Sequence, residues 1–430
     1  MAEQHEKALV PQIRFTGFTD PWEQRKLGEV ARRVTRKNEN GDSDLPLTIS
    51  AQYGLVDQRT FFNSQVASKD MSGYFLLHRG EFAYNKSTST DSPWGAIKRL
   101  EKYDMGCVST LYICFELLSG DPDFLVTYYE TDRWYKSVQL IAAEGARNHG
   151  LLNIAPDDFF ETQICIPKRI DEQRRIGAFF DRLDSLITLH QRKYDKLCVL
   201  KKSMLDKMFP KGGSLYPEIR FAGFTDPWEQ RKLGELASKR IEKNTNGIKE
   251  TFTNSAEHGV VSQLDYFDHD ITNDANIGNY SVVHPDDFIY NPRISAVAPC
   301  GPINRNKLDR NGVMSPLYTV FSVDDTIDKL YLEHYFKTSR WHQFMFLEGN
   351  SGARSDRFSI SDSIFFEMPI QCPVLEEQEL IASFFGRLDS LITLHQRKYC
   401  GVASWMLGVA LVRLGSESDG AFGEMKHVLR

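Results

Sequence analysis

Two stretches of the chain carry a stripe of mostly apolar residues at alternating steps of three and four positions. The first stripe runs from Ile176 to Met208, and the second begins the same way at Ile381. This spacing is typical of a coiled-coil seam, so each stretch is predicted to be a long helix. The seam positions are Ile176, Phe180, Leu183, Ile187, His190, Tyr194, Leu197, Lys201, Met204 and Met208, then Ile381, Phe385, Leu388, Ile392, His395 and Tyr399.

Prolines delimit the first of these helices. Pro167 precedes it and Pro210 follows it, and neither residue suits a helix interior. We expect a helix from about Asp171 to Phe209, which at 1.5 Å per residue is roughly 57 Å long. One such helix cannot bury its stripe alone, so the two helices are predicted to pack against each other antiparallel.

The end of the second stretch departs from the first. The sequence after Tyr399 differs from that after Tyr194, yet the apolar stripe continues. Two glycines there each cost about 1 kcal/mol relative to alanine, which packing can offset. We therefore expect the second helix to reach about Leu414, and residues 415–430 to fray or be disordered. The alternative is that the altered sequence cannot pack and the second helix ends near Tyr399. The continuing stripe positions are Val402, Met406 and Val409.

An internal repeat organises the chain. The string GFTDPWEQRKLGE at 17–29 returns unchanged at 223–235, and RLDSLITLHQRKY at 182–194 returns unchanged at 387–399. These matches indicate a duplicated unit of about 205 residues. The segments at the helices are fixed, whereas the sequence between the repeats has diverged. That layout favours a partner-binding scaffold that presents two different recognition domains. A duplicated enzyme would instead be expected to preserve its catalytic residues in both copies.

The diverged regions mix short alternating strands with helices. Strands are predicted at 110–115 and 318–322, and helices at 122–137 and 328–347. The predicted fold class is therefore α+β. Two tandem homologous domains are joined by the two long antiparallel coiled-coil helices, about a pseudo-twofold axis, and such symmetry suits two-part DNA sites.

Bulk properties narrow the class of protein. The net charge of −6 argues against a simple nucleic-acid-coating protein, so composition alone does not indicate DNA. The 7 cysteines form no CxxC pair, which fits a reducing compartment and no zinc site. No apolar run is long enough for a membrane span, and no signal peptide is evident. We expect a cytoplasmic protein.

Several of these motifs together resemble one protein family. GFTDPWEQRKLGE precedes each diverged region, and a proline follows each at Pro167 and Pro373. Glu-Gln then opens each helix, at Glu172 and Glu377, with FF and LD further along. Over about residues 11–399 this combination closely resembles type I restriction-modification enzyme specificity (S) subunits, the HsdS family. The sequence after Tyr399 departs from the family pattern.

The resemblance implies a DNA-reading subunit of a bacterial or archaeal cell. Each diverged region would be a target-recognition domain that reads one half of a bipartite double-stranded DNA target. The helices would dock two methyltransferase (M) subunits, and two restriction (R) subunits would join the full complex, with no membrane involved. The implied domains are 1–10 (flexible N-terminus), 11–165 (recognition domain 1), 166–210 (spacer helix 1), 211–216 (linker), 217–371 (recognition domain 2), 372–414 (spacer helix 2) and 415–430 (tail).

Catalytic motifs are missing from the sequence. A base-flipping methyltransferase needs a doubled proline after Asn, Asp or Ser, and an ATP-driven motor needs a GxxxxGK[ST] loop; neither is present. Asp171 and Glu172 have no phosphate loop to act with, so they are interpreted as helix N-terminal acids. The prediction is a non-catalytic chain that binds no cofactor, with S-adenosylmethionine, ATP and Mg on partner subunits.

The histidine pair and the repeated tryptophans have structural interpretations. His190 and His395 occupy equivalent seam positions. A metal shared between them is conceivable, but a packed or hydrogen-bonded interface histidine is favoured, so no metal site is predicted. Trp22 and Trp228 lie in the fixed segments and are interpreted as core residues that anchor the domains, not as base-stacking platforms.

DNA contacts are expected where matched positions carry different polar residues. Two loops in each half fit, one after the shared Tyr-Asn and one after the shared Gly-Ala-Arg. Arg147 and Arg354 are the same in both halves, so they are expected to hold phosphate; a structural arginine is the alternative. The DNA-binding candidates are Arg32, Arg33, Arg36, Lys37, Lys86, Ser87, Thr88, Ser89, Arg147, Asn148, Asn291, Arg293, Ser295, Arg354, Ser355 and Arg357.

The helices supply the partner-binding candidates. These are Phe180, Leu183, Ile187, Phe385, Leu388 and Ile392. Two other functions remain open at this point. An orphan two-headed DNA-binding regulator would need no catalytic partner, and a purely protein-binding scaffold would not need differing polar loops at matched positions. Co-purification with a methyltransferase subunit separates them.

Overall fold

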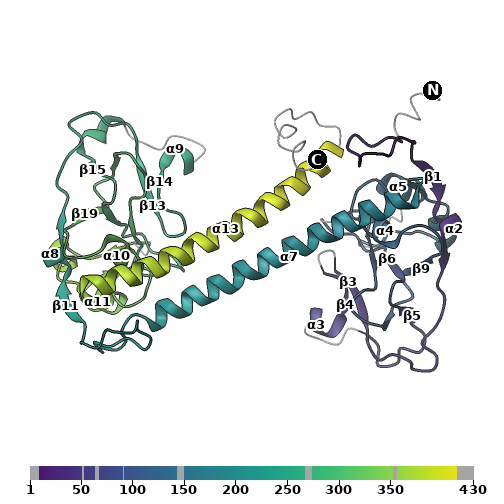
Figure 1. Cartoon of the computed structure of the whole chain (residues 1–430), viewed down its shortest axis with the longest axis horizontal. Coiled ribbons are helices and arrows are strands. Elements are labelled where there is room, and N and C mark those ends of the chain that lie inside the picture. The colour runs from purple at the N-terminus through teal and green to yellow at the C-terminus, as the bar shows by residue number, and fades with distance from the viewer. Residues whose placement is uncertain are drawn as a thin grey trace. The chain divides into compact units, whose positions relative to one another are not determined.

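The computed structural model describes residues 9–50, 53–62, 67–90, 92–142, 150–266, 274–351 and 356–413. These residues divide between two compact units, one of Met1–Leu189 with Tyr399–Arg430 and one of His190–Lys398. We call them the first and the second unit, and their elements are labelled in Figure 1. The predicted tail at 415–430 and most of the predicted flexible N-terminus lie outside the described residues.

The first unit is built on a four-stranded antiparallel sheet in the order β2-β9-β6-β7. Two-stranded sheets formed by β1 with β10, β3 with β4 and β5 with β8 surround it. The bounds are β1 Glu23–Lys26, β2 Ala31–Arg33, β3 Leu47–Ser50, β4 Gly54–Asp57, β5 Phe75–His78, β6 Phe82–Asn85, β7 Ala96–Arg99, β8 Met105–Val108, β9 Ile113–Leu117 and β10 Gln163–Ile166. The short helices are α2 Leu27–Val30, α3 Gln58–Phe62, α4 Pro122–Tyr129, α5 Tyr135–Ile141 and α6 Pro156–Phe160.

The second unit repeats this plan, with a four-stranded antiparallel sheet in the order β12-β19-β16-β17. Smaller sheets pair β11 with β22, β13 with β14, β15 with β18 and β20 with β21. The strands are β11 Glu229–Lys232, β12 Ala237–Lys239, β13 Phe252–Ser255, β14 Gly259–Ser262, β15 Ser281–Val283, β16 Phe288–Tyr290, β17 Ile303–Arg305, β18 Gly312–Met314, β19 Thr319–Val323, β20 Asn350–Ser351, β21 Phe358–Ser359 and β22 Pro369–Cys372. The helices are α8 Leu233–Leu236, α9 Gln263–Tyr266, η1 Asp274–Asn279, α10 Lys329–Tyr335, α11 His342–Glu348 and α12 Asp362–Phe365.

The predicted helices at 122–137 and 328–347 are wrong as single elements. Each is broken in two, into α4 and α5 in the first unit and α10 and α11 in the second. The break has a physical cause, because side chains take backbone carbonyls at the end of the first helix. Thr131 Oγ1 donates to the Tyr128 carbonyl at 2.7 Å, and Trp134 Nε1 donates to the Tyr129 carbonyl at 3.1 Å. Thr338 and Trp341 do the same in the second unit.

Stacked aromatic rings form the centre of each core. In the first unit Phe82 stacks on Phe115 with ring centroids 5.1 Å apart, and the matched Phe288 and Phe321 stack at 5.5 Å in the second. Such pairs add about 0.5–1.5 kcal/mol to the free energy gained by burial. Trp228 is buried in the second core, and Trp22 packs against the first core, as predicted for domain-anchoring residues.

Two long helices, α7 at Ile170–Lys207 and α13 at Leu375–Arg413, pass from one unit into the other. Within the second unit their segments run antiparallel, since His190 contacts His395 while Lys201 contacts Asp389. The ion pair explains why a lysine interrupts the predicted apolar seam. The two histidine rings meet through their Nδ1 atoms at 2.9 Å, which is the hydrogen-bonded pairing that the sequence favours.

Candidate nucleic-acid interface

The two predicted reading loops that follow Tyr-Asn have the same backbone frame in both units. Each loop begins with an asparagine side chain that accepts from the backbone two residues later. Asn85 Oδ1 accepts from Ser87 N at 3.0 Å, and Asn291 Oδ1 accepts from Arg293 N at 3.0 Å. Asparagine favours this local turn because its short side chain can replace a backbone acceptor. Arg293 and Ser87 therefore occupy the same place in the frame.

The far end of each loop is also held identically. Tyr84 Oη donates to the Trp94 carbonyl at 2.8 Å, and Tyr290 Oη donates to the Cys300 carbonyl at 2.9 Å. A glycine follows in the left-handed region, at φ 81° for Gly95 and 82° for Gly301. A Cβ at either glycine would clash with the carbonyl of the asparagine that opens the loop. Only glycine fits there.

Each of these loops is joined to the region of the second predicted reading loop, at residues 356–357 in the second unit and at residues 150–151, just after the predicted loop, in the first unit. Ser87 forms an antiparallel bridge with Leu151, and Arg293 forms one with Arg357. The matching backbone hydrogen bonds are Thr88 N to Gly150 O at 2.6 Å and Ile294 N to Asp356 O at 3.1 Å. Segments about 60 residues apart in the sequence thus form one short ribbon in each unit, as their joint role in reading would require.

Most of the exposed side chains of the frame differ between the two units, and the matched serines Ser89 and Ser295 are the exception. Ser87, Ser89 and Thr90 are exposed in the first unit, and Arg293, Ser295 and Ala296 hold the matched exposed positions. Thr88 is half-buried, and its hydroxyl donates to the Gly150 carbonyl at 3.1 Å. Asn291 turns inward, with its amide nitrogen on the Asn254 carbonyl at 2.8 Å. A fixed backbone therefore presents a variable surface.

Lys86 does not present its charge to this surface. Its Nζ donates to the Ile154 carbonyl at 3.3 Å, and burial lowers the pKa of the ammonium. We therefore leave Lys86 out of the proposed contacts.

The basic residues on and after β2 are held by local partners. Arg32 Nε donates to Glu116 at 2.7 Å, and Arg33 lies 3.9 Å from Asp157. Lys37 Nζ donates to the Gly73 carbonyl and lies 3.8 Å from the Phe75 ring centroid. Their charges are partly satisfied within the protein, so phosphate contacts here remain a prediction with less support than the loops have.

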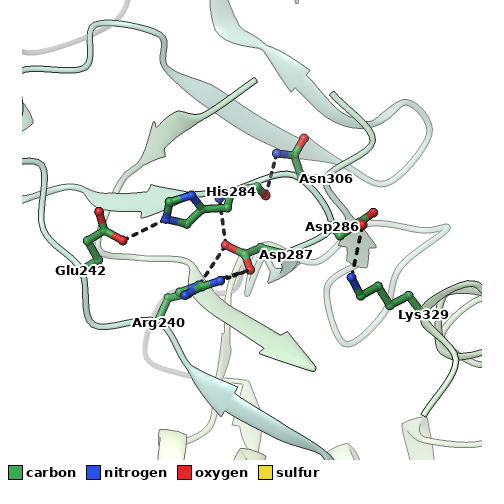
Figure 2. Close-up of polar contacts among 7 residues, drawn as sticks. All are labelled: Arg240, Glu242, His284, Asp286, Asp287, Asn306 and Lys329. Atoms are coloured by element: carbon green, nitrogen blue, oxygen red, sulfur yellow. Dashed lines mark hydrogen bonds and ion pairs between the residues drawn. The ribbon is translucent and has the colours of Figure 1, made fainter. Parts of the chain in front are cut away.

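Arg36 has a structural role that recurs in the second unit. Its Nη2 donates to Glu81 Oε1 at 2.7 Å. In the second unit Arg240 pairs with Asp287 at 3.1 Å, while His284 N donates to the same carboxylate (Figure 2). The arginine has moved two positions along an extended segment, which keeps its side chain on the same face. We therefore leave Arg36 out of the proposed interface.

Four of the predicted DNA-binding residues cannot be placed. Arg147, Asn148, Arg354 and Ser355 lie outside the described residues. Their assignment to phosphate or loop contacts stays a prediction.

The repeated Glu-Gln that opens each long helix has a role beyond that of an N-terminal acid. Glu172 is buried and accepts two hydrogen bonds from Arg14, at 2.6 and 2.7 Å. Glu377 accepts two from Arg220, both at 2.8 Å. The following Gln173 accepts from Asp121 N at 2.8 Å, which fixes the start of α4. The sequence analysis missed this buried ion pair. It could have been found from the arginine that recurs three residues before each GFTDPWE string.

The partner-binding candidates differ in what they expose. Phe385 is completely buried and Leu388 nearly so, because both pack in the core of the second unit. They have no surface to offer a partner, so we leave them out of the partner surface. Phe180, Leu183, Ile187 and Ile392 are half-buried. Among the leucines that the seam pattern did not single out, Leu186 and Leu189 on α7 and Leu391 and Leu394 on α13 are 40–45% exposed.

Two kinds of site were sought over the residues that the structure describes. No group of three or more His, Cys, Asp or Glu is placed to hold a metal ion there. None of the helices in this part of the chain combines the length and apolar character needed to cross a membrane.

Part of the chain matches a known protein family. Residues 225–402 match the family described as "Type I restriction modification DNA specificity domain". The predicted resemblance to type I specificity subunits is thereby confirmed. A search of curated proteins finds no match to the chain.

A solved structure of a specificity subunit shares the mixed helix-and-sheet fold of this chain. The type I S subunit from M. genitalium is 12% identical, with a TM-score of 0.54, covering 93% of this chain and 98% of its own. The HsdS subunit from Thermoanaerobacter tengcongensis is 16% identical, with a TM-score of 0.43 and coverage of 93% and 97%. A chain from a structure describing assembly of a type I R-M system is 16% identical, with a TM-score of 0.45 and coverage of 93% and 98%.

Proposed function

We propose that this chain is the non-catalytic DNA specificity subunit of a type I restriction-modification complex. Each unit reads one half of a bipartite target in double-stranded DNA, and α7 and α13 dock two methyltransferase subunits. Adenine methylation and ATP-dependent restriction are carried out by those subunits and by restriction subunits. S-adenosylmethionine, ATP and Mg bind to the partners. The observation that carries the proposal is the pair of identical loop frames with different exposed side chains.

Within each loop, one set of groups holds the backbone in place and another set is exposed and available to contact DNA. Hydrogen bonds inside the frame use backbone groups, inward-facing side chains and the matched hydroxyls of Ser89 and Ser295. The other exposed positions are therefore free to vary without altering the fold. Sequence readout depends on side chains that reach base edges, whereas phosphate contacts mainly fix register. Two frames that present Ser87 in one unit and Arg293 in the other should therefore select different bases.

Exchange of residues 31–165 for the equivalent region of another specificity subunit should change one half of the target. The other half should stay the same, because its reading loops belong to the second unit. The measurement is sequencing of methylated adenines in host DNA that expresses the exchanged protein with its methyltransferase subunit. A swap that altered both halves together would reject two independent reading units. The purified chain alone should transfer no methyl group in the same assay.

The exposed leucines should contribute to docking of the methyltransferase subunit. We expect Leu186→Glu and Leu391→Glu each to weaken that association about tenfold, because a buried charge replaces an apolar contact. Affinity for the purified methyltransferase subunit measures the effect. Leu140→Glu is the matched control, since Leu140 is 82% exposed but belongs to α5 and to neither long helix. Equal loss in all three variants would reject docking through these leucines.

A further inference from the structure

The second unit places two arginines opposite each other on the ribbon formed by its two reading loops. Arg293 and Arg357 are direct partners in an antiparallel bridge, so their side chains leave the same face of the ribbon. Like charges placed directly opposite each other are destabilising. A pair of this kind is therefore unfavourable for folding unless something else uses it.

Little within the protein offsets this repulsion. The Arg293 side chain is 70% exposed, and its Nη2 lies 3.9 Å from a carboxylate oxygen of Asp356, at the limit of an ion pair. Asp356 is itself half-exposed, so the interaction is weak in water. Arg357 has no ion pair within the described residues. The two guanidinium groups thus keep most of their donors available.

The first unit shows that the frame does not need these arginines. Ser87 faces Leu151 at the matched bridge, and the surrounding hydrogen bonds are the same. A serine and a leucine carry no charge, so the arginine pair is a property of the second unit alone. The shared frame does not require these two arginines, and their like charges repel each other. Because guanidinium groups carry only hydrogen-bond donors, the pair indicates a ligand with acceptor groups.

On the basis of the proposed function, we propose that Arg293 reads a guanine in the half-target bound by the second unit. Arg357 binds the adjacent phosphate backbone. Guanine presents two acceptors, N7 and O6, in the major groove, and the arginine fork carries only donors. Adenine presents a donor at N6, which arginine cannot use. A two-stranded ribbon is narrow enough to enter the major groove, which brings the tip of Arg293 to the base edges.

The matched residues of the first unit supply the test variants. Arg293→Ser and Arg357→Leu each install a residue that the same frame already holds, so the loop should remain folded. Hydrogen exchange of the second unit checks that it does. The full chain, with its methyltransferase subunit, is used to select bound duplexes from a randomised DNA library at several salt concentrations.

The wild type should select a two-part target with a guanine in the second half. Arg293→Ser should reduce preference for that guanine about 5- to 100-fold, with the rest of the target and the salt dependence unchanged. Arg357→Leu should weaken binding to all sequences and lower the salt slope by about one unit, without changing base preference. Val297→Ala, at an exposed residue of the same loop that has no assigned DNA contact, is the control and should leave the guanine preference intact.

Three results would overturn the assignment. Uniform weakening by Arg293→Ser with a smaller salt slope would make Arg293 a phosphate contact. If Arg293→Ser had no effect on binding or on base preference, Arg293 would not be part of the interface. If the wild-type target held no guanine in its second half, the proposal that Arg293 reads guanine would be rejected, while the proposed function would stand. A wild type that selects no two-part target would instead reject the proposed function itself, so the two failures are distinguishable.

Discussion

Replacement of Arg220 by alanine is expected to destabilise the second unit by about 3–5 kcal/mol. Its partner Glu377 has a side chain with no exposed surface, and Arg220 supplies two hydrogen bonds to it at 2.8 Å. Removing the arginine leaves a buried carboxylate without a counter-charge. The loss should be measured as the change in free energy of unfolding of the second unit, followed by hydrogen exchange of its core amides.

Two further variants separate the buried charge from other effects. Arg220→Lys keeps the charge but loses the planar fork, so it should cost less than Arg220→Ala. Arg14→Ala makes the same change in the first unit, where Trp22 Nε1 also donates to Glu172 at 3.3 Å. Glu172 therefore keeps one donor, and the first unit should lose less stability. An Arg220→Ala effect below about 1 kcal/mol would show that the pair is not an essential counter-charge.

The long helix was predictable because its sequence signals are strong and local. The predicted limits of Asp171 and Phe209 lie close to those of α7, Ile170–Lys207. The apolar stripe repeats over many helical turns, and prolines flank it at both ends. These local signals determine the existence and the limits of the helix without information from the rest of the fold. The short helices were not predictable to the same degree, because Thr131 and Trp134 end and restart them through side-chain hydrogen bonds.

The candidate site was predictable in outline and not in detail. The comparison of matched positions predicted two loops in each unit. Backbone bridges join the first loop to Arg357 of the second loop in the second unit, and to Leu151, just after the predicted loop, in the first unit. The inward turn of Lys86 could not be predicted, because its acceptor is the carbonyl of Ile154, far away in the sequence. The burial of Phe385 could not be predicted either. The seam pattern shows that the helix has an apolar face, but not which part of that face packs in the core of its own unit.

His334 should make the stability of the second unit depend on pH. The side chain is 1% exposed, and neither ring nitrogen has a hydrogen-bond partner among the described residues. The ring lies against Phe385, with ring centroids 5.1 Å apart. Burial lowers the pKa of His334 to about 4, and the nearby charges act in both directions. Those charges are Lys201 and Lys307, which lower the pKa, and Asp389 and Glu333, which raise it.

The sign of the effect follows from the two protonation states. The unfolded chain binds a proton near the ordinary pKa of about 6.5, whereas the folded unit resists protonation down to about 4. Between these values the unfolded state holds more protons, so stability falls as the pH is lowered. The full shift corresponds to a loss of about 3 kcal/mol at the acid end. Above about pH 7 the histidine should contribute no pH dependence.

We expect His334→Asn to flatten the fall in stability of the second unit between pH 6.5 and pH 4. Asparagine cannot take up a proton in this range, so the contribution of about 3 kcal/mol disappears from the slope, whatever the variant does to stability at neutral pH. The free energy of unfolding at a series of pH values, from urea titrations, measures the slope. His258→Asn changes an exposed histidine of the same unit and is the control. If both variants kept the wild-type slope, carboxylates and not His334 would govern the acid sensitivity of this unit, and the buried ring would have a purely packing role.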